Sequence, residues 1–217
     1  MCGRYAFQFF EDFVDRYDIQ DAIDLTSTYN AAPGMNMPVV TRNSPNKVEI
    51  MKWGLIPPWA KDIRIGFKMI NARAESITEK RTYSKPFKSQ RCLVPFTAFY
   101  EWKKEGKDKT PYLFHDLKHK YLSFAGLYEI AHDADGKEIK SFTIITTPAN
   151  KSMHGIHERM PVILDKADED IWLDKSTSQE DLMKLLDGYE SKSFEVYQVS
   201  DQVNSAQNQS VDLLSPV

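Results

Sequence analysis

Short strand-like segments, separated by turn-forming residues, restrict the fold of this chain more than any other feature of its sequence. Segments rich in β-branched or aromatic residues are Arg4 to Phe9, Val48 to Trp53, Arg91 to Lys103, Lys140 to Thr147, Arg159 to Leu164 and Phe194 to Val199. The turn Asp133-Ala134-Asp135-Gly136 ends in Asp-Gly, which predicts a hairpin between Leu122–Ile130 and Glu138–Ile145. Because a hairpin pairs consecutive strands antiparallel, the pattern predicts a mainly antiparallel sheet.

Helical patterns are fewer and shorter. Apolar residues at helical spacing predict a helix over Phe10–Tyr17. The segments Asp168–Leu173 and Ser178–Leu186 predict two more short helices, and Ser178 is the expected N-cap of the second.

Two long stretches, Thr26–Met37 and Pro57–Asn71, are predicted to be irregular, which is typical of functional loops in a compact domain. No repeat and no Pro/Gly-rich linker divides the chain. We therefore expect residues 1–217 to form one α+β domain. Residues 204–217 are polar and then apolar, and are expected either to fray or to dock as a C-terminal tail.

Composition and charge exclude several classes of protein. Hydrophobic residues make up 41% of the 217 residues and charged residues 27%, which is ordinary for a soluble globular protein. No apolar run approaches the roughly 18–20 residues that cross a bilayer, and no secretory signal is visible. Two cysteines, Cys2 and Cys92, do not make a disulfide framework, so we expect a cytoplasmic location, nucleoid-associated in a bacterium. The net charge of −3 requires that any nucleic acid bind to a local basic patch.

Metal and phosphate-loop chemistry are not indicated. His115 and His119 are four residues apart, and His154 and His157 are three apart, but the residues around them predict strands and loops rather than helices. Neither a Gly-x-Ser-x-Gly motif nor a Gly-rich phosphate loop is present. We therefore expect no metal ion and no other cofactor.

The second residue, Cys2, is the strongest candidate for chemistry. Removal of Met1 would leave Cys2 with both a free α-amine and a thiol, which titrate near ~7.7–8 and ~8.5. Such an aminothiol condenses with an aldehyde to an imine and then to a five-membered thiazolidine. It can also attack an amide, as in N-terminal nucleophile hydrolases. The alternative is an ordinary buried cysteine that follows a start codon.

Three polar residues, Asn71, Glu101 and His157, lie within or beside apolar stretches. Glu101 is flanked by aromatic residues, where desolvation should raise its carboxyl pKa toward that of a general acid near neutral pH. Alternatively, Glu101 lies on the solvent face of an alternating strand. Together with Cys2, these residues would supply a nucleophile, an acid/base, a proton shuttle and an orienting amide.

Motifs along the whole chain carry a family resemblance. They are Met1-Cys2-Gly3-Arg4-Tyr5, Tyr29-Asn30-Ala31-Ala32-Pro33, Trp53-Gly54-Leu55-Ile56-Pro57 with Trp59, Ile70-Asn71-Ala72-Arg73-Ala74-Glu75, Arg91-Cys92, Phe99-Tyr100-Glu101-Trp102-Lys103, Ile156-His157-Glu158-Arg159-Met160-Pro161, and the ending from Asn208 to Val217. In this order they resemble the SRAP family (SOS-response-associated peptidase). The chain departs from some bacterial members at Trp59-Ala60, where they carry two adjacent tryptophans.

The resemblance implies a fold and a set of roles. Family members have a single α+β domain with a curved, barrel-like antiparallel sheet, bind single-stranded DNA and link covalently to abasic sites. By resemblance, Cys2 crosslinks, Asn71 orients it, Glu101 acts as acid/base and His157 transfers protons. The residues implied to contact DNA are Arg4, Arg73 and Arg159 for phosphates, and Trp59 and Trp102 for bases. Met1 would be removed by the protein itself or by an aminopeptidase.

These expectations combine into one function and two alternatives. The sequence predicts a monomeric sensor and shield of abasic sites in single-stranded DNA, active in the DNA damage (SOS) response through lyase-type imine chemistry, with no membrane partner. One alternative is a cysteine peptidase or amidohydrolase that acts on external substrates, which peptide turnover without DNA would favour. The other is a non-covalent reader of single-stranded or modified DNA, which binding unaffected by Cys2→Ala would favour.

Overall fold

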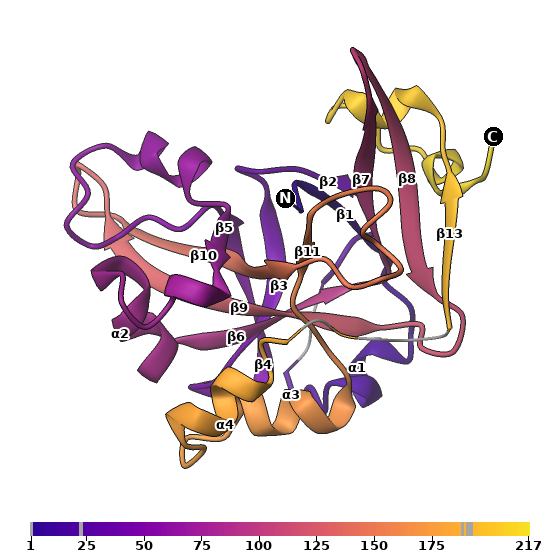
Figure 1. Cartoon of the computed structure of the whole chain (residues 1–217). Coiled ribbons are helices and arrows are strands. Elements are labelled where there is room, and N and C mark those ends of the chain that lie inside the picture. Colours follow the sequence, from indigo (N-terminus) through magenta and orange to yellow (C-terminus); the bar gives the residue numbers. More distant parts are fainter. Residues whose placement is uncertain (1, 22–23, 188, 190–192) are drawn as a thin grey trace.

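Two β-sheets form the body of the protein, whose computed structural model describes residues 2–21, 24–187, 189 and 193–217 (Figure 1). In spatial order, the strands of the first sheet are β13 (Phe194–Gln198), β8 (Asp108–Asp116), β7 (Ala98–Glu105), β1 (Arg4–Phe7) and β2 (Thr28–Ala31). The pairings within this sheet are antiparallel. The long β7–β8 hairpin extends beyond the rest of the sheet (Figure 1).

Five strands of the second sheet close into a barrel. In ring order they are β4 (Ser44–Trp53), β3 (Asn36–Thr41), β6 (Arg91–Phe96), β9 (Leu122–His132) and β10 (Glu138–Pro148). Three short strands pair with β10 or β9: β5 (Asn71–Arg73), β11 (Arg159–Pro161) and β12 (Ile163–Leu164). The ring is antiparallel except where β10 closes on β4. The predicted α+β class with a barrel-like, mainly antiparallel sheet is confirmed.

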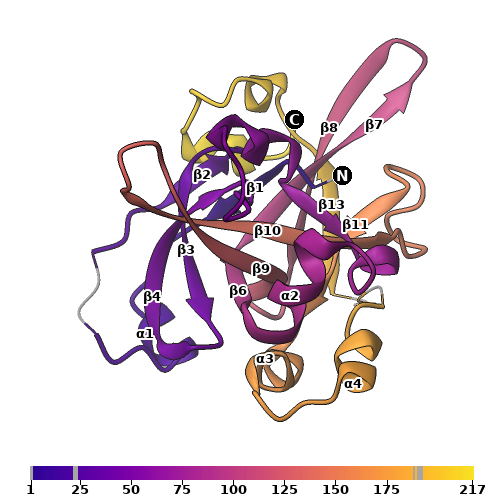
Figure 2. The same cartoon turned by 90° about the vertical axis from the view of Figure 1, so that its left-hand side faces the viewer.

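The helices are short. The α-helices are α1 (Phe13–Arg16), α2 (Arg81–Ser89), α3 (Lys166–Leu173) and α4 (Gln179–Lys184), and the 3-10 helices are η1 (Ile63–Lys68), η2 (Ala74–Ser76), η3 (Asp201–Asn204) and η4 (Val211–Leu214). Helices α3 and α4 lie at the end of the molecule opposite the projecting β7–β8 hairpin (Figure 2). Ser178 caps α4 as predicted, since its hydroxyl accepts from the Asp181 N–H at 3.1 Å. Within the described residues, no helix is long and apolar enough to cross a membrane.

Two predicted strands are each divided in two. The segment Arg91 to Lys103 breaks at Thr97, whose N–H donates to the Ala6 carbonyl at 2.9 Å, because β6 belongs to the barrel and β7 to the other sheet. The segment Arg159 to Leu164 breaks at Val162, where the chain passes from β10, the partner of β11, to β9, the partner of β12.

Other boundaries also differ from the sequence predictions. The helix predicted over Phe10–Tyr17 is wrong in extent, since α1 covers only its second half. The stretch Thr26–Met37, predicted to be irregular, contains β2 and the start of β3. The patterns do not predict α2 or β8, which contain Pro86 and Pro111, because proline removes a backbone donor and is unfavourable inside both kinds of element.

Aromatic side chains join the two sheets and fix the start of the chain. The rings of Phe96 and Phe124 stack with centroids 3.8 Å apart, and the ring of Phe99 from the other sheet meets both of them edge-on. Tyr5 of β1 packs against Phe124 and Trp53, with centroids 5.7 and 5.1 Å away. Because these rings are buried, β1 is held firmly against the barrel, and Cys2 and Gly3 before it have a defined position.

Candidate active site at the N-terminus

Cys2 lies immediately before β1, and its side chain is completely buried. Asn71, the first residue of β5, donates from Nδ2 to the Cys2 carbonyl oxygen at 2.9 Å. Strand β5 is positioned in turn by its parallel pairing with β10, in which Asn71 is opposite Ile144. Asn71 therefore contacts Cys2 directly, and its orienting role in catalysis stays a prediction.

Glu101 lies on β7, next to Cys2 in space. The pairing of Arg4 with Tyr100 brings the start of β1 alongside this part of β7. Glu101 is only 2% exposed, so it is not on the solvent face of its strand. Burial raises the pKa of its carboxyl above the ordinary value, because the charged form loses hydration. Burial and the nearby Glu101 charge together raise the pKa of the Cys2 thiol, which favours the neutral thiol.

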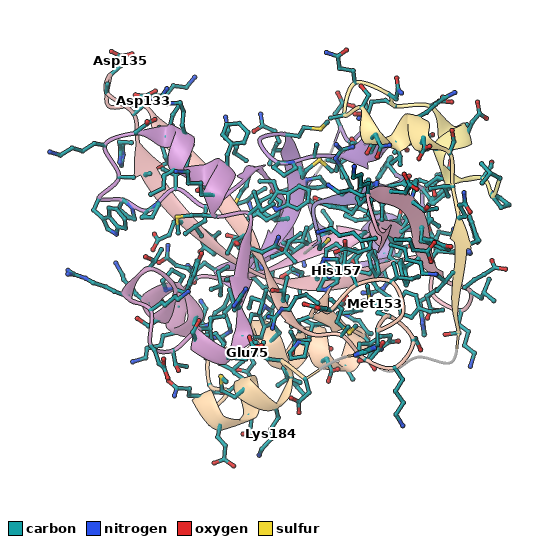
Figure 3. The ribbon with its side chains drawn as sticks, turned by 45° about the horizontal axis from the view of Figure 1, so that its top comes forward. Glu75, Asp133, Asp135, Met153, His157 and Lys184 are labelled. Carbon is teal, nitrogen blue, oxygen red and sulfur yellow. The ribbon has the colours of Figure 1, made fainter. Side chains whose placement is uncertain are left out.

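His157 comes from the loop before β11, which also carries Met153 (Figure 3). Backbone hydrogen bonds hold this loop. The His157 N–H donates to the Met153 carbonyl at 3.0 Å, and the Arg159 N–H donates to His157 Nδ1 at 2.9 Å. The same Nδ1 also lies 3.1 Å from the Arg159 carbonyl oxygen, so the backbone of Arg159 holds this side of the imidazole ring. The nearby His157 opposes the rise in the pKa of the Glu101 carboxyl that burial causes.

The four predicted catalytic residues thus meet in one place, although they come from four different parts of the chain. Cys2 supplies a thiol, Asn71 an amide that binds its backbone, Glu101 a buried carboxyl and His157 an imidazole. The other histidine pair has different partners: His115 binds Glu195, and His119 binds Asp116. Within the described residues, no group of three or more His, Cys, Asp or Glu side chains is arranged to hold a metal ion.

The two arginines near this cluster differ in what they contact. Arg159 binds both carboxylate oxygens of Glu75 through its two Nη atoms, and its Nη2 also donates to the Thr146 carbonyl at 2.6 Å. This pairing lowers the pKa of the Glu75 carboxyl. Arg73 is exposed at the end of β5. A phosphate that binds Arg159 would therefore share the guanidinium with Glu75, whereas Arg73 faces solvent.

Arg4 holds the C-terminal tail. Its Nη1 donates to Asn30 Oδ1 at 2.9 Å and to the Val203 carbonyl at 2.6 Å, and its Nη2 donates to the Asn204 carbonyl at 3.2 Å. Asn30 is completely buried and donates from Nδ2 to the carbonyls of Val203, Ser205 and Asn208. The tail is therefore docked against β1 and β2. The predicted phosphate contact of Arg4 stays a prediction, and the structure adds this second role.

We expect Arg4→Ala to lower the free energy of unfolding by about 1–3 kcal/mol, because the Asn30 side chain and the carbonyl oxygens of Val203 and Asn204 lose their charged donor. Urea unfolding would measure the change, and hydrogen exchange of residues 203–209 would show whether the tail undocks. Arg73→Ala is the matched control, since the exposed Arg73 side chain should leave stability unchanged. Equal stabilities of the Arg4 variant and the parent would contradict a role of Arg4 in holding the C-terminal tail.

The two predicted stacking residues lie in two separate grooves. Trp59 is 62% exposed and, with Arg81 and Thr82, lines a groove of about 330 Å³. Trp102 lines a second groove, of about 350 Å³, which also contains His157. The Trp102 Nε1 donates to Asn204 Oδ1 at 2.8 Å, so the docked tail fixes this indole ring.

Sequence reasoning did not assign roles to Glu75, Asn30 and Asn204. Glu75 and Asn30 both lie within motifs that carried the family resemblance, and this position is the signal that could have identified them. Asn204 gives no such signal, because its contacts with Arg4 and Trp102 join residues about 200 and 102 positions away along the chain.

The structure therefore combines a closed β-barrel with a buried cysteine near the start of the chain, and an asparagine, a glutamate and a histidine lie beside this cysteine. The chain matches the family called SOS response associated peptidase (SRAP) over residues 1–206, and it belongs to this family.

Individual relatives support this membership. The abasic site processing protein YoaM of Bacillus subtilis is 44% identical over 99% of this chain and 97% of its own length. The abasic site processing protein HMCES of Xenopus tropicalis is 31% identical over 88% of this chain and 66% of its own length. A crystal structure of a protein from Bacteroides thetaiotaomicron superposes with a TM-score of 0.90 at 27% identity and covers 100% of both chains.

Proposed function

We propose that this protein processes abasic sites in single-stranded DNA by capturing them covalently at Cys2 once Met1 has been removed. The observation that carries the proposal is the buried cluster in which Asn71 binds the Cys2 carbonyl, beside Glu101 and His157. The names of the relatives, which are abasic site processing proteins, support the same substrate. Met1 itself lies outside the described residues, and its removal, by the protein or by an aminopeptidase, is part of the proposal.

The proposed reaction balances with the loss of one water molecule. The abasic sugar opens from its hemiacetal to an aldehyde, and the Cys2 α-amine attacks C1′. Water leaves and an imine forms. The thiol sulfur then adds to the imine carbon, its proton moves to the nitrogen, and a thiazolidine ring closes. An open imine would acidify the C2′ proton and promote strand cleavage by β-elimination, so ring closure protects the strand.

Glu101 and His157 suit the proton transfers that this sequence requires. Sugar opening moves a proton from one oxygen to another, and imine formation needs a proton for the departing water. The raised pKa of Glu101 keeps a proton on its carboxyl to higher pH than is ordinary for glutamate. His157, whose Nδ1 is held by the backbone of Arg159, supplies an imidazole that can act as a proton donor or acceptor.

The environment of the thiol argues against the external peptidase alternative. Cysteine peptidases need a thiolate and lower the pKa of their cysteine with a nearby cation or a helix N-terminus. Burial and Glu101 act in the opposite direction on Cys2. A neutral thiol that adds to an imine after the amine has reacted does not need this activation.

Intact mass spectrometry followed by a crosslinking assay tests the proposal. The mass shows whether Met1 is absent, and incubation with single-stranded DNA that carries an abasic site should give a band that resists denaturant. Undamaged DNA of the same sequence is the control. The absence of a stable band from protein that lacks Met1 would overturn the covalent function, and peptide turnover without DNA would replace it with the peptidase alternative.

Charge removal at Arg73 should weaken the binding of intact single-stranded DNA, and the affinity should fall as salt rises, because phosphate contacts release counterions. For single strands, the loss of one phosphate contact should reduce the magnitude of the slope of log affinity against log salt concentration by about 0.7. Arg159→Gln should act in the same direction. Fluorescence anisotropy over a salt series would measure both changes, and an affinity that is independent of salt would contradict the proposed basic contacts.

A further inference from the structure

Glu75 and Arg159 come from segments on opposite edges of β10 and meet across this strand. Thr146 of β10 pairs with β5 on one edge and with β11 on the other. Glu75 lies in η2, directly after β5, and Arg159 is the first residue of β11. The Glu75 carboxylate binds both Nη atoms of Arg159. The pair therefore joins the strand that begins with Asn71 to the strand that follows His157.

The hydrogen bonds of the Arg159 guanidinium show which of its donors are already used. A guanidinium carries five N–H donors, and the edge formed by its two Nη atoms matches either a carboxylate or a phosphate. Glu75 takes this edge, and Nη2 also donates to the carbonyl and hydroxyl oxygens of Thr146 at 2.6 and 3.2 Å. The Nε atom is buried and has no hydrogen-bond partner among the described residues. A phosphate in solvent therefore needs the same two Nη atoms that bind Glu75.

Glu75 is the member of this pair that can move. The Glu75 side chain is 49% exposed, whereas that of Arg159 is 15% exposed. Ion pairs with so exposed a partner contribute little to stability, because the carboxylate is well hydrated without its partner. Thr146 gives the guanidinium a second anchor, which stays in place when Glu75 moves away. Arg159 therefore does not depend on Glu75 alone for its orientation.

The charge of Glu75 also acts on a second arginine. Its bond to Arg159 lowers the pKa of the Glu75 carboxyl, and the nearby charge of Arg73 acts in the same direction. Glu75 is therefore an anion that lies close to two of the arginines proposed to contact DNA phosphates.

We propose that Glu75 is a specificity-determining residue, which occupies the phosphate-binding edge of Arg159 until a DNA phosphate displaces it. This inference rests on the proposed function, because it takes Arg159 as a phosphate contact. Displacement exchanges one anion for another on the same two Nη atoms, so it stabilises the complex less than an unopposed contact. Undamaged strands gain only such contacts and bind weakly, whereas an abasic strand also gains the covalent bond to Cys2.

Binding of undamaged single-stranded DNA to a Cys2→Ala protein tests this role without crosslinking. Glu75→Gln keeps the size of the side chain and removes its charge, so affinity should rise severalfold. The slope of log affinity against log salt concentration should grow in magnitude by up to about 0.7, because one phosphate contact is no longer opposed. Glu75→Ala should act in the same direction. Fluorescence anisotropy measures both changes, and an affinity that falls or stays the same in the two variants would overturn the inference.

Two controls separate displacement at Arg159 from a general loss of negative charge. Glu158→Gln removes the same charge from an exposed side chain one residue before Arg159, and it should raise affinity less than Glu75→Gln does. In an Arg159→Gln background, Glu75→Gln should have no more effect than Glu158→Gln. An equal gain from Glu158→Gln, or the full gain in the absence of Arg159, would overturn the inference.

Protein with the parent Cys2 shows the consequence for capture. The concentration of undamaged strand that halves adduct formation should fall in Glu75→Gln by the same factor as the Kd. If Glu75→Gln raises affinity for undamaged strands but no adduct forms with abasic DNA, the covalent function fails and the role of Glu75 is supported. If the adduct forms and the affinity is unchanged, the covalent function is supported and the role of Glu75 fails.

Discussion

Replacing Cys2 by alanine or serine is expected to abolish the stable adduct with abasic single-stranded DNA. Both variants keep an α-amine at residue 2, so an imine can form, but neither has a thiol to close the thiazolidine ring. Only a labile species should remain, visible on a denaturing gel after reduction with borohydride and absent without it. The expected loss of stable adduct is essentially complete, which is the largest effect predicted for this protein.

The second cysteine of the chain provides a matched control. Cys92 is also completely buried, but it lies on β6 inside the barrel, where its Sγ faces Gly126. Cys92→Ala should therefore form the adduct at the parent yield, with a modest loss of stability from the small cavity. A stable adduct in Cys2→Ala at the parent yield would contradict the assignment of Cys2.

Blocking the α-amine should also abolish the stable adduct, and it should abolish the imine that borohydride traps in the Cys2 variants. A retained Met1 or an upstream tag converts the amine of Cys2 to an amide, which cannot form an imine. The expected result is no adduct from the blocked protein and recovery of the adduct after an aminopeptidase removes the block. Intact mass gives the state of the N-terminus in each sample.

How far the fold could be predicted depends on whether each element has a local signal. The β9–β10 hairpin has such a signal in Asp135-Gly136. The predicted hairpin is confirmed, since the two strands pair antiparallel from Glu138 opposite His132 to Ile144 opposite Gly126. Barrel closure has none, because Ser141 pairs with Lys52 in parallel across a long stretch of chain. Such a contact depends on the packing of the whole sheet. The curved, barrel-like sheet is therefore implied by the family resemblance alone, and local residue patterns do not predict it.

The candidate site shows the same division. A carboxylate among aromatic residues is unusual enough for the sequence to single out Glu101, and the structure shows it buried next to Cys2. Other contacts of the site have main-chain carbonyl oxygens as acceptors. Asn71 donates to the carbonyl of Cys2, and Arg4 donates to the carbonyl of Val203 in the C-terminal tail. Every residue carries such an oxygen, so no sequence pattern marks these contacts.

Glu101 and His157 should each change the rate of crosslinking far more than the affinity for DNA. Glu101→Gln keeps the size of the side chain and removes its acid, and His157→Ala removes the imidazole. We expect both variants to bind single-stranded DNA nearly as the parent does and to form the adduct ~10²–10⁴-fold more slowly, the usual range for a general acid/base. Glu101→Gln should also slow the reversal of the ring. Single-turnover gel assays would measure the formation rates.

The pH dependence separates the role of Glu101 from simple damage to the site. Its folded pKa is raised above the ordinary ~4.3, so the folded protein holds a proton that the unfolded chain loses. Stability should therefore fall as pH rises from about 4.3 through the folded pKa, and Glu101→Gln should remove this fall. If Glu101 acts as an acid, the parent rate should decline over the upper part of the same interval, and the glutamine variant should show a flatter profile. Parent rates at all pH values in folded Glu101→Gln and His157→Ala proteins would mean that the Cys2 chemistry proceeds without assistance from either residue.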